Sequence, residues 1–110
     1  MNLTKIMDAL KELSNIDYQR RVWMGLGNRE VSSIEEAGCR LFVDSGLGHA
    51  LSMGTVYSEQ IDEALKRLRD DVEALYMKVN TLADVEAATM QHVRSESHSI
   101  LSAIKTETLR

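Results

Sequence analysis

The stretch EQIDEALKRLRDDVEALYMKV, residues 59–79, determines the expected fold. Its apolar residues recur at alternating steps of four and three, at Ile61, Leu65, Leu68, Val72, Leu75 and Val79. This spacing places them on one face of a helix, in a heptad-like stripe. Ser58 precedes the stretch and is suited to cap the helix. We therefore expect 59–79 to be the longest regular helix of the chain.

The apolar stripe can be covered in two ways. Three heptads suit antiparallel packing against a final helix, which the apolar spacing predicts from Leu82 toward Lys105. The alternative is pairing with a second copy, which would make the protein a homodimer. On the polar faces, oppositely charged residues stand at i, i+4 spacing and should support the helix. These pairs are Asp62–Lys66, Glu63–Arg67 and Arg69–Glu73.

Composition extends the helical prediction to the whole chain. Its 110 residues contain no proline, and only 5% are aromatic. Helix interiors exclude proline, whereas sheets favour aromatic residues, so both features indicate helix. The length suits one domain. We expect an all-α, small single-domain helical bundle of four to six helices over residues 1–110, with a C-terminal segment, 95–110, that is weakly helical and prone to fraying.

A second helix is predicted within SSIEEAGCRLFVDSGL, residues 32–47. Ser32 with Glu35, and Ser33 with Glu36, each fit a capping box, in which a hydroxyl and a carboxylate satisfy backbone N–H groups at a helix start. Gly46 can adopt the left-handed conformation that ends a helix. The stretch therefore resembles a capped helix more than a chemical site.

Phosphate-binding loops are not indicated. GLGNRE, residues 25–30, has glutamate where a dinucleotide-binding fingerprint needs its third glycine, and it follows a predicted helix instead of a strand. GLGHAL, residues 46–51, fails at its last position for the same reason. Both patterns are better explained as turns, so we expect no cofactor.

Metal and nucleophile patterns are also weak. His92 and His98 are six residues apart, whereas helical zinc ligands share a face at three or four. Cys39 with His49 could form a nucleophile and base. However, Cys39 lies in a predicted helix beside apolar residues, where a small buried cysteine is typical. We therefore expect neither a catalytic nor a metal site, and the protein should not be an enzyme.

Charge is concentrated in the middle of the chain. Residues 30–73 carry ten acidic and four basic side chains, a net charge of −6, whereas residues 1–29 sum to +2 and residues 74–110 to zero. An acidic surface repels nucleic acid and anionic membranes and attracts a basic protein, although it can also serve solubility alone. The candidate partner-binding residues are Glu35, Glu36, Asp44, Tyr57, Glu59 and Glu63.

Cellular location is indicated by the start of the chain and by its cysteine content. The opening MNLTKIMDAL lacks the continuous apolar core of a secretory signal. A single cysteine rules out an internal disulfide. We expect a cytoplasmic protein that does not span a membrane.

The segment RRVWMGLGNREVSSIEEAGCRLFVDSGL, residues 20–47, resembles small bacterial immunity proteins of polymorphic toxin and contact-dependent growth inhibition systems. Trp23, the SSIEEA helix start and the LFVDSGL helix end carry the resemblance, over about a quarter of the chain. It implies a cytoplasmic, non-catalytic protein that neutralises a cognate toxin domain, often a nuclease. No binding motif of such a family can be matched residue by residue.

Two functions therefore remain open. The first is an immunity protein whose acidic surface binds a basic toxin domain. The second is a helical scaffold or chaperone-like interaction module that self-associates through the 61–79 stripe.

Overall fold

The chain forms helices of 3 to 21 residues in the computed structural model, which describes residues 1–27 and 29–108. The elements are α1 (Leu3–Ser14), α2 (Ile16–Tyr18), η1 (Gln19–Trp23), α3 (Ile34–Cys39), η2 (Arg40–Asp44), α4 (Leu47–Met53), α5 (Glu59–Ala74), α6 (Leu82–Glu86) and α7 (Ala88–Thr108). The η segments are π-helical and directly continue α2 and α3. Asn28, in the predicted 25–28 turn, lies outside the described residues, as do residues 109–110 of the predicted frayed segment.

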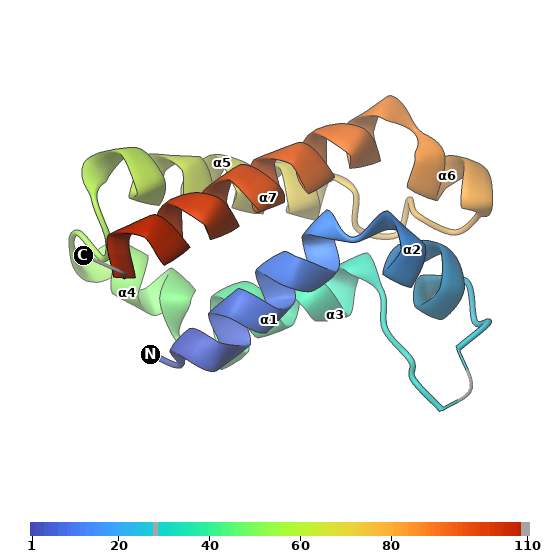
Figure 1. The fold of residues 1–110 in the computed structure, drawn as a ribbon, viewed down its shortest axis with the longest axis horizontal. Helices are drawn as coiled ribbons and strands as arrows, with labels where there is room; N and C mark the ends of the chain where they lie inside the picture. Colours follow the sequence, from blue (N-terminus) through green and yellow to red (C-terminus); the bar gives the residue numbers. More distant parts are fainter. Residues whose placement is uncertain (28, 109–110) are drawn as a thin grey trace.

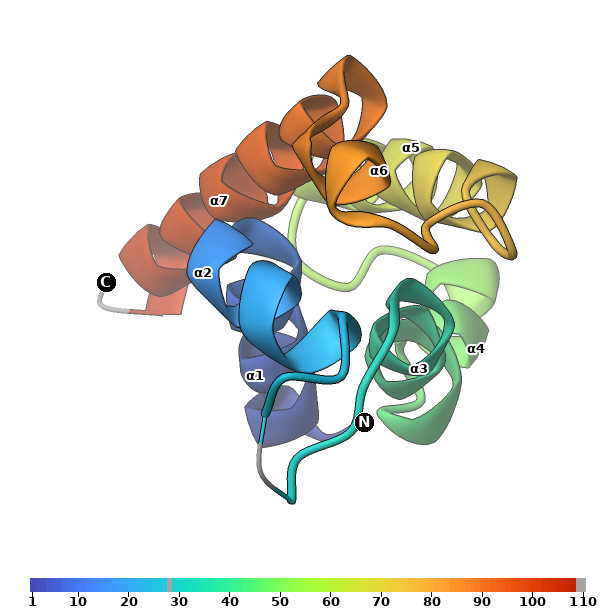
Figure 2. The same cartoon turned by 90° about the vertical axis from the view of Figure 1, so that its right-hand side faces the viewer.

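Four helical segments surround one apolar core. In Figure 1, α5 and α7 lie above α1 and α3, and in Figure 2 α2 and α6 lie toward the viewer. The segments α5 and α7 run antiparallel, as predicted from the stripe (Figure 1). The Cα radius of gyration is 13.6 Å, close to the roughly 13 Å of a compact domain of this size.

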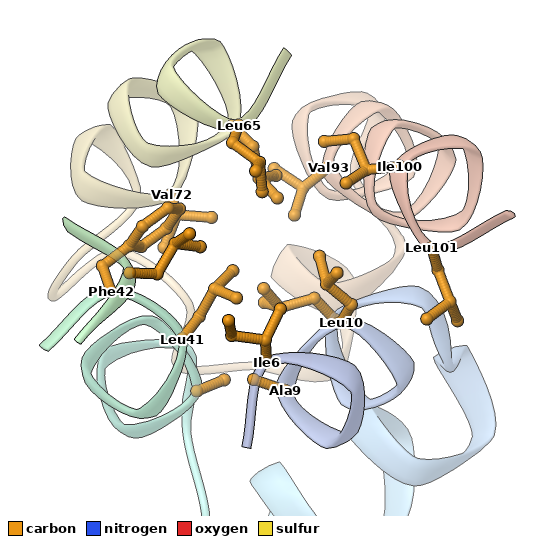
Figure 3. Packing of buried hydrophobic residues seen from close by; sticks show 14 of the residues in the cluster. Ile6, Ala9, Leu10, Leu41, Phe42, Leu65, Val72, Val93, Ile100 and Leu101 are labelled. Carbon is orange, nitrogen blue, oxygen red and sulfur yellow. The ribbon is translucent and has the colours of Figure 1, made fainter. Parts of the chain in front are cut away.

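The stripe of α5 supplies much of this core. Leu65, Leu68 and Val72 have no solvent exposure and belong to the buried apolar cluster. In Figure 3, Leu65 and Val72 face apolar residues of α1, η2 and α7. Ile61 and Leu75 pack against its margin. The stripe is therefore covered within the chain.

The number and lengths of the helices differ from the prediction. The described residues contain seven α-helices, compared with the four to six expected. The longest is α7, with 21 residues, because SESHS does not interrupt it. Ser97 of that segment is fully buried, which shows that the polar segment packs into the domain. Helix α5 has 16 residues and ends at Ala74, five residues before the predicted end.

The N-terminal end of α5 is organised by Asp62. Its buried carboxylate accepts hydrogen bonds from the backbone N–H groups of Val56 (2.7 Å) and Tyr57 (3.0 Å). The predicted Asp62–Lys66 pair therefore does not form, and Lys66 instead lies 3.5 Å from Glu63. Asp62 fixes the loop that joins α4 to α5.

A polar network joins α1 to the start of α3. The buried Glu12 accepts hydrogen bonds from Trp23 Nε1 (2.9 Å) and Ser32 Oγ (2.5 Å), and its other oxygen lies 3.2 Å from Arg40. Ser32 is thus not an alternative cap, contrary to prediction. The cap is Ser33, whose Oγ accepts from the N–H of Glu36 at 3.1 Å.

No helix in the described part of the chain combines the length and the apolar character needed to cross a membrane.

Candidate functional site

The predicted residues Glu35 and Glu36 lie in the first turn of α3, directly after the Ser33 cap. Glu35 Oε1 accepts a hydrogen bond from the backbone N–H of Met77, 3.3 Å away and 42 residues later in the chain. The start of α3 is thereby joined to the loop that follows α5. Glu36 is exposed at the same helix start.

Met77 has an unusual backbone conformation. Its φ of 67° makes it the one non-glycine residue with a positive φ among those the structure describes. This left-handed conformation is disfavoured for residues with a side chain and marks a strained position. It leaves the methionine side chain 81% exposed. The loop thus holds an apolar side chain out in solvent.

Tyr76 lies beside Met77, between α5 and α3. A Cβ added to Gly38 would clash with the Tyr76 hydroxyl, which shows how closely the tyrosine lies over α3. Burial, followed by the nearby Glu73, Cys39 and Glu35, raises the pKa of Tyr76. The ring is therefore half-buried within an acidic environment.

We call the group formed by Glu35, Glu36, Glu73, Tyr76 and Met77 the acidic corner. No ion pair within residues 1–27 and 29–108 involves any of its three carboxylates. The three carboxylates and the exposed Lys78, which follows Met77, together carry a net charge of −2. Unpaired surface carboxylates around an aromatic and an apolar side chain can attract a basic protein and then contact it.

The other predicted residues do not belong to this corner. Helix α3 and its continuation η2 run antiparallel to α5, since Gly38 meets Tyr76 while Phe42 lies 6.0 Å from the Arg69 guanidinium. Asp44 ends this segment, roughly 13 Å from Glu35 along the axis. Two predicted residues, Glu59 and Glu63, are exposed at the opposite end of α5.

Tyr57 is used inside the domain. Its ring packs against the core, and its hydroxyl is buried without a hydrogen-bond partner among the described residues. Burial, then the charges of Asp62 and Glu107, raises the pKa of this tyrosine. Its position does not favour the partner-binding role predicted for it, whereas the Tyr76 ring is half-buried beside the exposed Met77.

Cys39 is exposed, contrary to the expectation that it is buried. Its Sγ lies 3.8 Å from Asp44 Oδ1, and the contacts of the described residues include none between Cys39 and His49. The pair is therefore not assembled as a nucleophile and base in this structure.

A second polar group lies between α5 and α7. His92 Nε2 is 3.4 Å from Asp71 Oδ2 and 3.2 Å from Glu96 Oε1. The donor atoms of all three residues lie within 4.8 Å of one another. Hollows of about 340 and 220 Å³ adjoin the group, and His92 lines both of them. Asp71, His92 and Glu96 form what we call the α5–α7 triad.

Glu96 is the most strongly perturbed carboxyl of the triad. Burial, a hydrogen bond with Asp71 and repulsion by that residue raise the pKa of Glu96 to about 7, against the opposing effects of His92 and Arg67. Its Oε1 is inaccessible to solvent and has no hydrogen bond of good geometry within the described chain. Two carboxyls and one imidazole therefore face a common point.

Both groups contain residues that the sequence interpretation missed. His92 and Glu96 stand at i, i+4, a spacing that places two metal-binding side chains on one helix face, but only histidine pairs were considered. The contribution of Asp71 depends on how α5 packs against α7. Tyr76 and Met77 were assigned to the interior of a helix, and no glycine or proline marked the turn there.

No protein-family model, curated protein or solved structure matches the chain. Its function therefore has to be inferred from its own surface.

Proposed function

We propose that this protein is a non-catalytic inhibitor of the immunity class, which binds a basic toxin domain through the acidic corner and neutralises it. One observation carries the proposal: Glu35 and Glu73, which form no ion pair in the described chain, lie near Tyr76 and a solvent-exposed, strained Met77, and Glu36 is exposed in the same first turn of α3 as Glu35. A nuclease is a suitable target, because its substrate-binding surface must be positive to attract phosphates.

The carboxylates would act before contact. Basic partners are steered by an acidic surface, and this raises the association rate in a manner that salt screens. Glu36 and Glu73 are exposed and suited to this role. Glu35 has a further role, since its hydrogen bond to the Met77 N–H supports the loop.

Tyr76 and Met77 would act after contact. Tyrosine is enriched among the residues that contribute most to binding, and methionine is enriched at interfaces. Because a packed anchor must be extracted before the partner leaves, its loss mainly raises the dissociation rate. The corner thus contributes to binding in two ways: its carboxylates raise the association rate, and its two other side chains lower the dissociation rate.

Self-association through the 61–79 stripe is less well supported. Leu65, Leu68 and Val72 are fully buried inside the monomer, so a dimer through them would require the core to open. A toxin complex through the corner needs no such rearrangement.

Association kinetics with the product of the neighbouring gene, where the proposal places the toxin domain, test the proposal. We expect the double variant Glu36→Lys/Glu73→Lys to associate more slowly, with the largest difference at low ionic strength. The matched control is Glu59→Lys/Glu63→Lys, which changes the net charge equally at the opposite end of α5. An equal effect of both double variants would show that the overall charge, and not the corner, attracts the partner. Absence of a complex at micromolar concentration would reject the function itself.

A further inference from the structure

The α5–α7 triad lies outside the acidic corner and is not needed for the proposed function. Asp71 comes from α5, whereas His92 and Glu96 stand one turn apart on α7. The three side chains therefore meet across the interface between two antiparallel helices (Figure 1). We propose that these residues form a binding site for a first-row divalent metal ion, with Zn²⁺ as the best-fitting candidate.

The distances fit such an ion. Ligands of tetrahedral Zn²⁺ lie 2.0–2.2 Å from the metal, which places the ligand atoms about 3.3 Å from one another. His92 Nε2 lies 3.4 Å from the Asp71 oxygen and 3.2 Å from the Glu96 oxygen. One nitrogen is thus at ligand spacing from both carboxylates. An imidazole and two carboxylates are also a donor set that zinc accepts.

Hydrogen bonding alone satisfies this arrangement poorly. The single N–H on Nε2 of a histidine can point at one carboxylate, but two approach that atom. Glu96 Oε1 is shielded from water and lacks a well-aligned donor among the described residues. A metal ion at the common point would interact with all three atoms at once.

The surroundings allow metal access and further ligands. The side chain of His92 is 65% exposed and that of Glu96 is 17% exposed, so the group is open to solvent and does not lie in the core. The adjoining hollows of about 340 and 220 Å³ can hold water or an added ligand at the fourth position. Arg67 lines the smaller hollow, and the two carboxyls, when both are ionised to bind a metal ion, carry one more charge than this arginine offsets.

Calorimetric titration of the metal-free full chain with ZnCl₂ tests the site. We expect one Zn²⁺ to bind per chain and to raise the melting temperature, because the ion joins α5 to α7. His92→Ala and Glu96→Gln should each weaken binding by at least about tenfold. Both changes should leave the far-UV circular dichroism spectrum unchanged, since His92 is exposed and glutamine has the shape of glutamate.

The matched control is His98→Ala. This residue is exposed on the same helix, so its removal leaves the chain with as many histidines as His92→Ala does. CoCl₂ supplies a spectroscopic readout, because four-coordinate Co²⁺ absorbs visible light strongly. We expect this absorption in the wild type and in His98→Ala, and its loss in His92→Ala. No saturable binding, or equal weakening by His98→Ala and His92→Ala, would overturn the proposal.

Discussion

Glu35 Oε1, in the first turn of α3, accepts a hydrogen bond of 3.3 Å from the backbone N–H of Met77, a residue that follows α5. The bond joins two segments far apart in sequence and gives a hydrogen-bond partner to the Met77 N–H, which lies beyond the end of α5. It also supports a left-handed residue whose side chain points into solvent. Strain of this kind persists where the surrounding structure enforces it, and it is frequent at binding sites.

Replacing Met77 with glycine separates stability from function. Glycine adopts a positive φ without steric cost, and an exposed methionine loses little burial, so we expect the variant to be more stable by about 0.5 to 1 kcal/mol. Urea unfolding measures this gain. If Met77 contacts the partner, the same variant should dissociate faster from the toxin domain.

Two variants control this experiment. Met77→Ala keeps the strained conformation, so it should lose binding without gaining stability. Met53→Ala removes another exposed methionine, 75% exposed at the end of α4, and should affect neither quantity. A Met77→Gly protein that is more stable and still binds with unchanged kinetics would exclude Met77 from the interface.

The packing of the hydrophobic core can be tested at Leu68. This residue is fully buried at the centre of the α5 stripe, and Leu68→Ala should lower the free energy of unfolding by about 2 to 5 kcal/mol. Leu26→Ala is the control, because this leucine is 75% exposed and its loss should change stability by less than about 0.5 kcal/mol. If the two variants unfold at the same urea concentration, the packing described for α5 is contradicted.

The two serines before α3 should differ in their effects. Ser33→Ala removes an N-cap and should cost about 1 kcal/mol. Ser32→Ala removes a donor to the buried Glu12 carboxylate and should cost more, about 1.5 to 3 kcal/mol. Chemical denaturation of both variants checks the order, and a larger loss for Ser33→Ala would refute the assignment of Ser32 to the Glu12 network.

Asp84 should give the protein part of its acid sensitivity. Hydrogen bonds from the backbone N–H groups of Asn80 and Thr81, both 2.9 Å, lower the pKa of this carboxyl in the folded state. Its contribution to stability is therefore present above the ordinary pKa of 3.8 and is lost as the pH falls through the folded value. The wild type should be more stable than Asp84→Asn at about pH 6, and the difference should shrink as the pH falls below 3.8. A difference that does not change with pH would contradict this role.

The main helices could be predicted from local patterns. Apolar spacing identified the α5 stripe, and the Ser58 and Ser33 caps stand where the sequence indicated. Those features depend on neighbours within one turn. The end of α5 could not be predicted from the sequence. Beyond it, the Met77 N–H donates a hydrogen bond to the distant Glu35, and Met77 adopts a left-handed conformation in which glycine is usual.

The candidate sites were predicted less completely. Glu35 and Glu36 were identified from charge, but Tyr76 and Glu73 join them only because α3 packs antiparallel to α5. Likewise, Asp71 reaches His92 through the pairing of α5 with α7. Contacts between helices distant in sequence leave no periodic pattern, so a single sequence does not reveal them.

Growth rescue tests the central claim most directly. The product of the neighbouring gene, where the immunity proposal places the toxin, is expressed with the wild type, with Glu36→Lys/Glu73→Lys, or with the control Glu59→Lys/Glu63→Lys, at matched protein levels. We expect rescue by the wild type and by the control, and weaker rescue by the corner variant. Failure of the wild type to restore growth, together with no complex at micromolar concentration, would contradict the central claim.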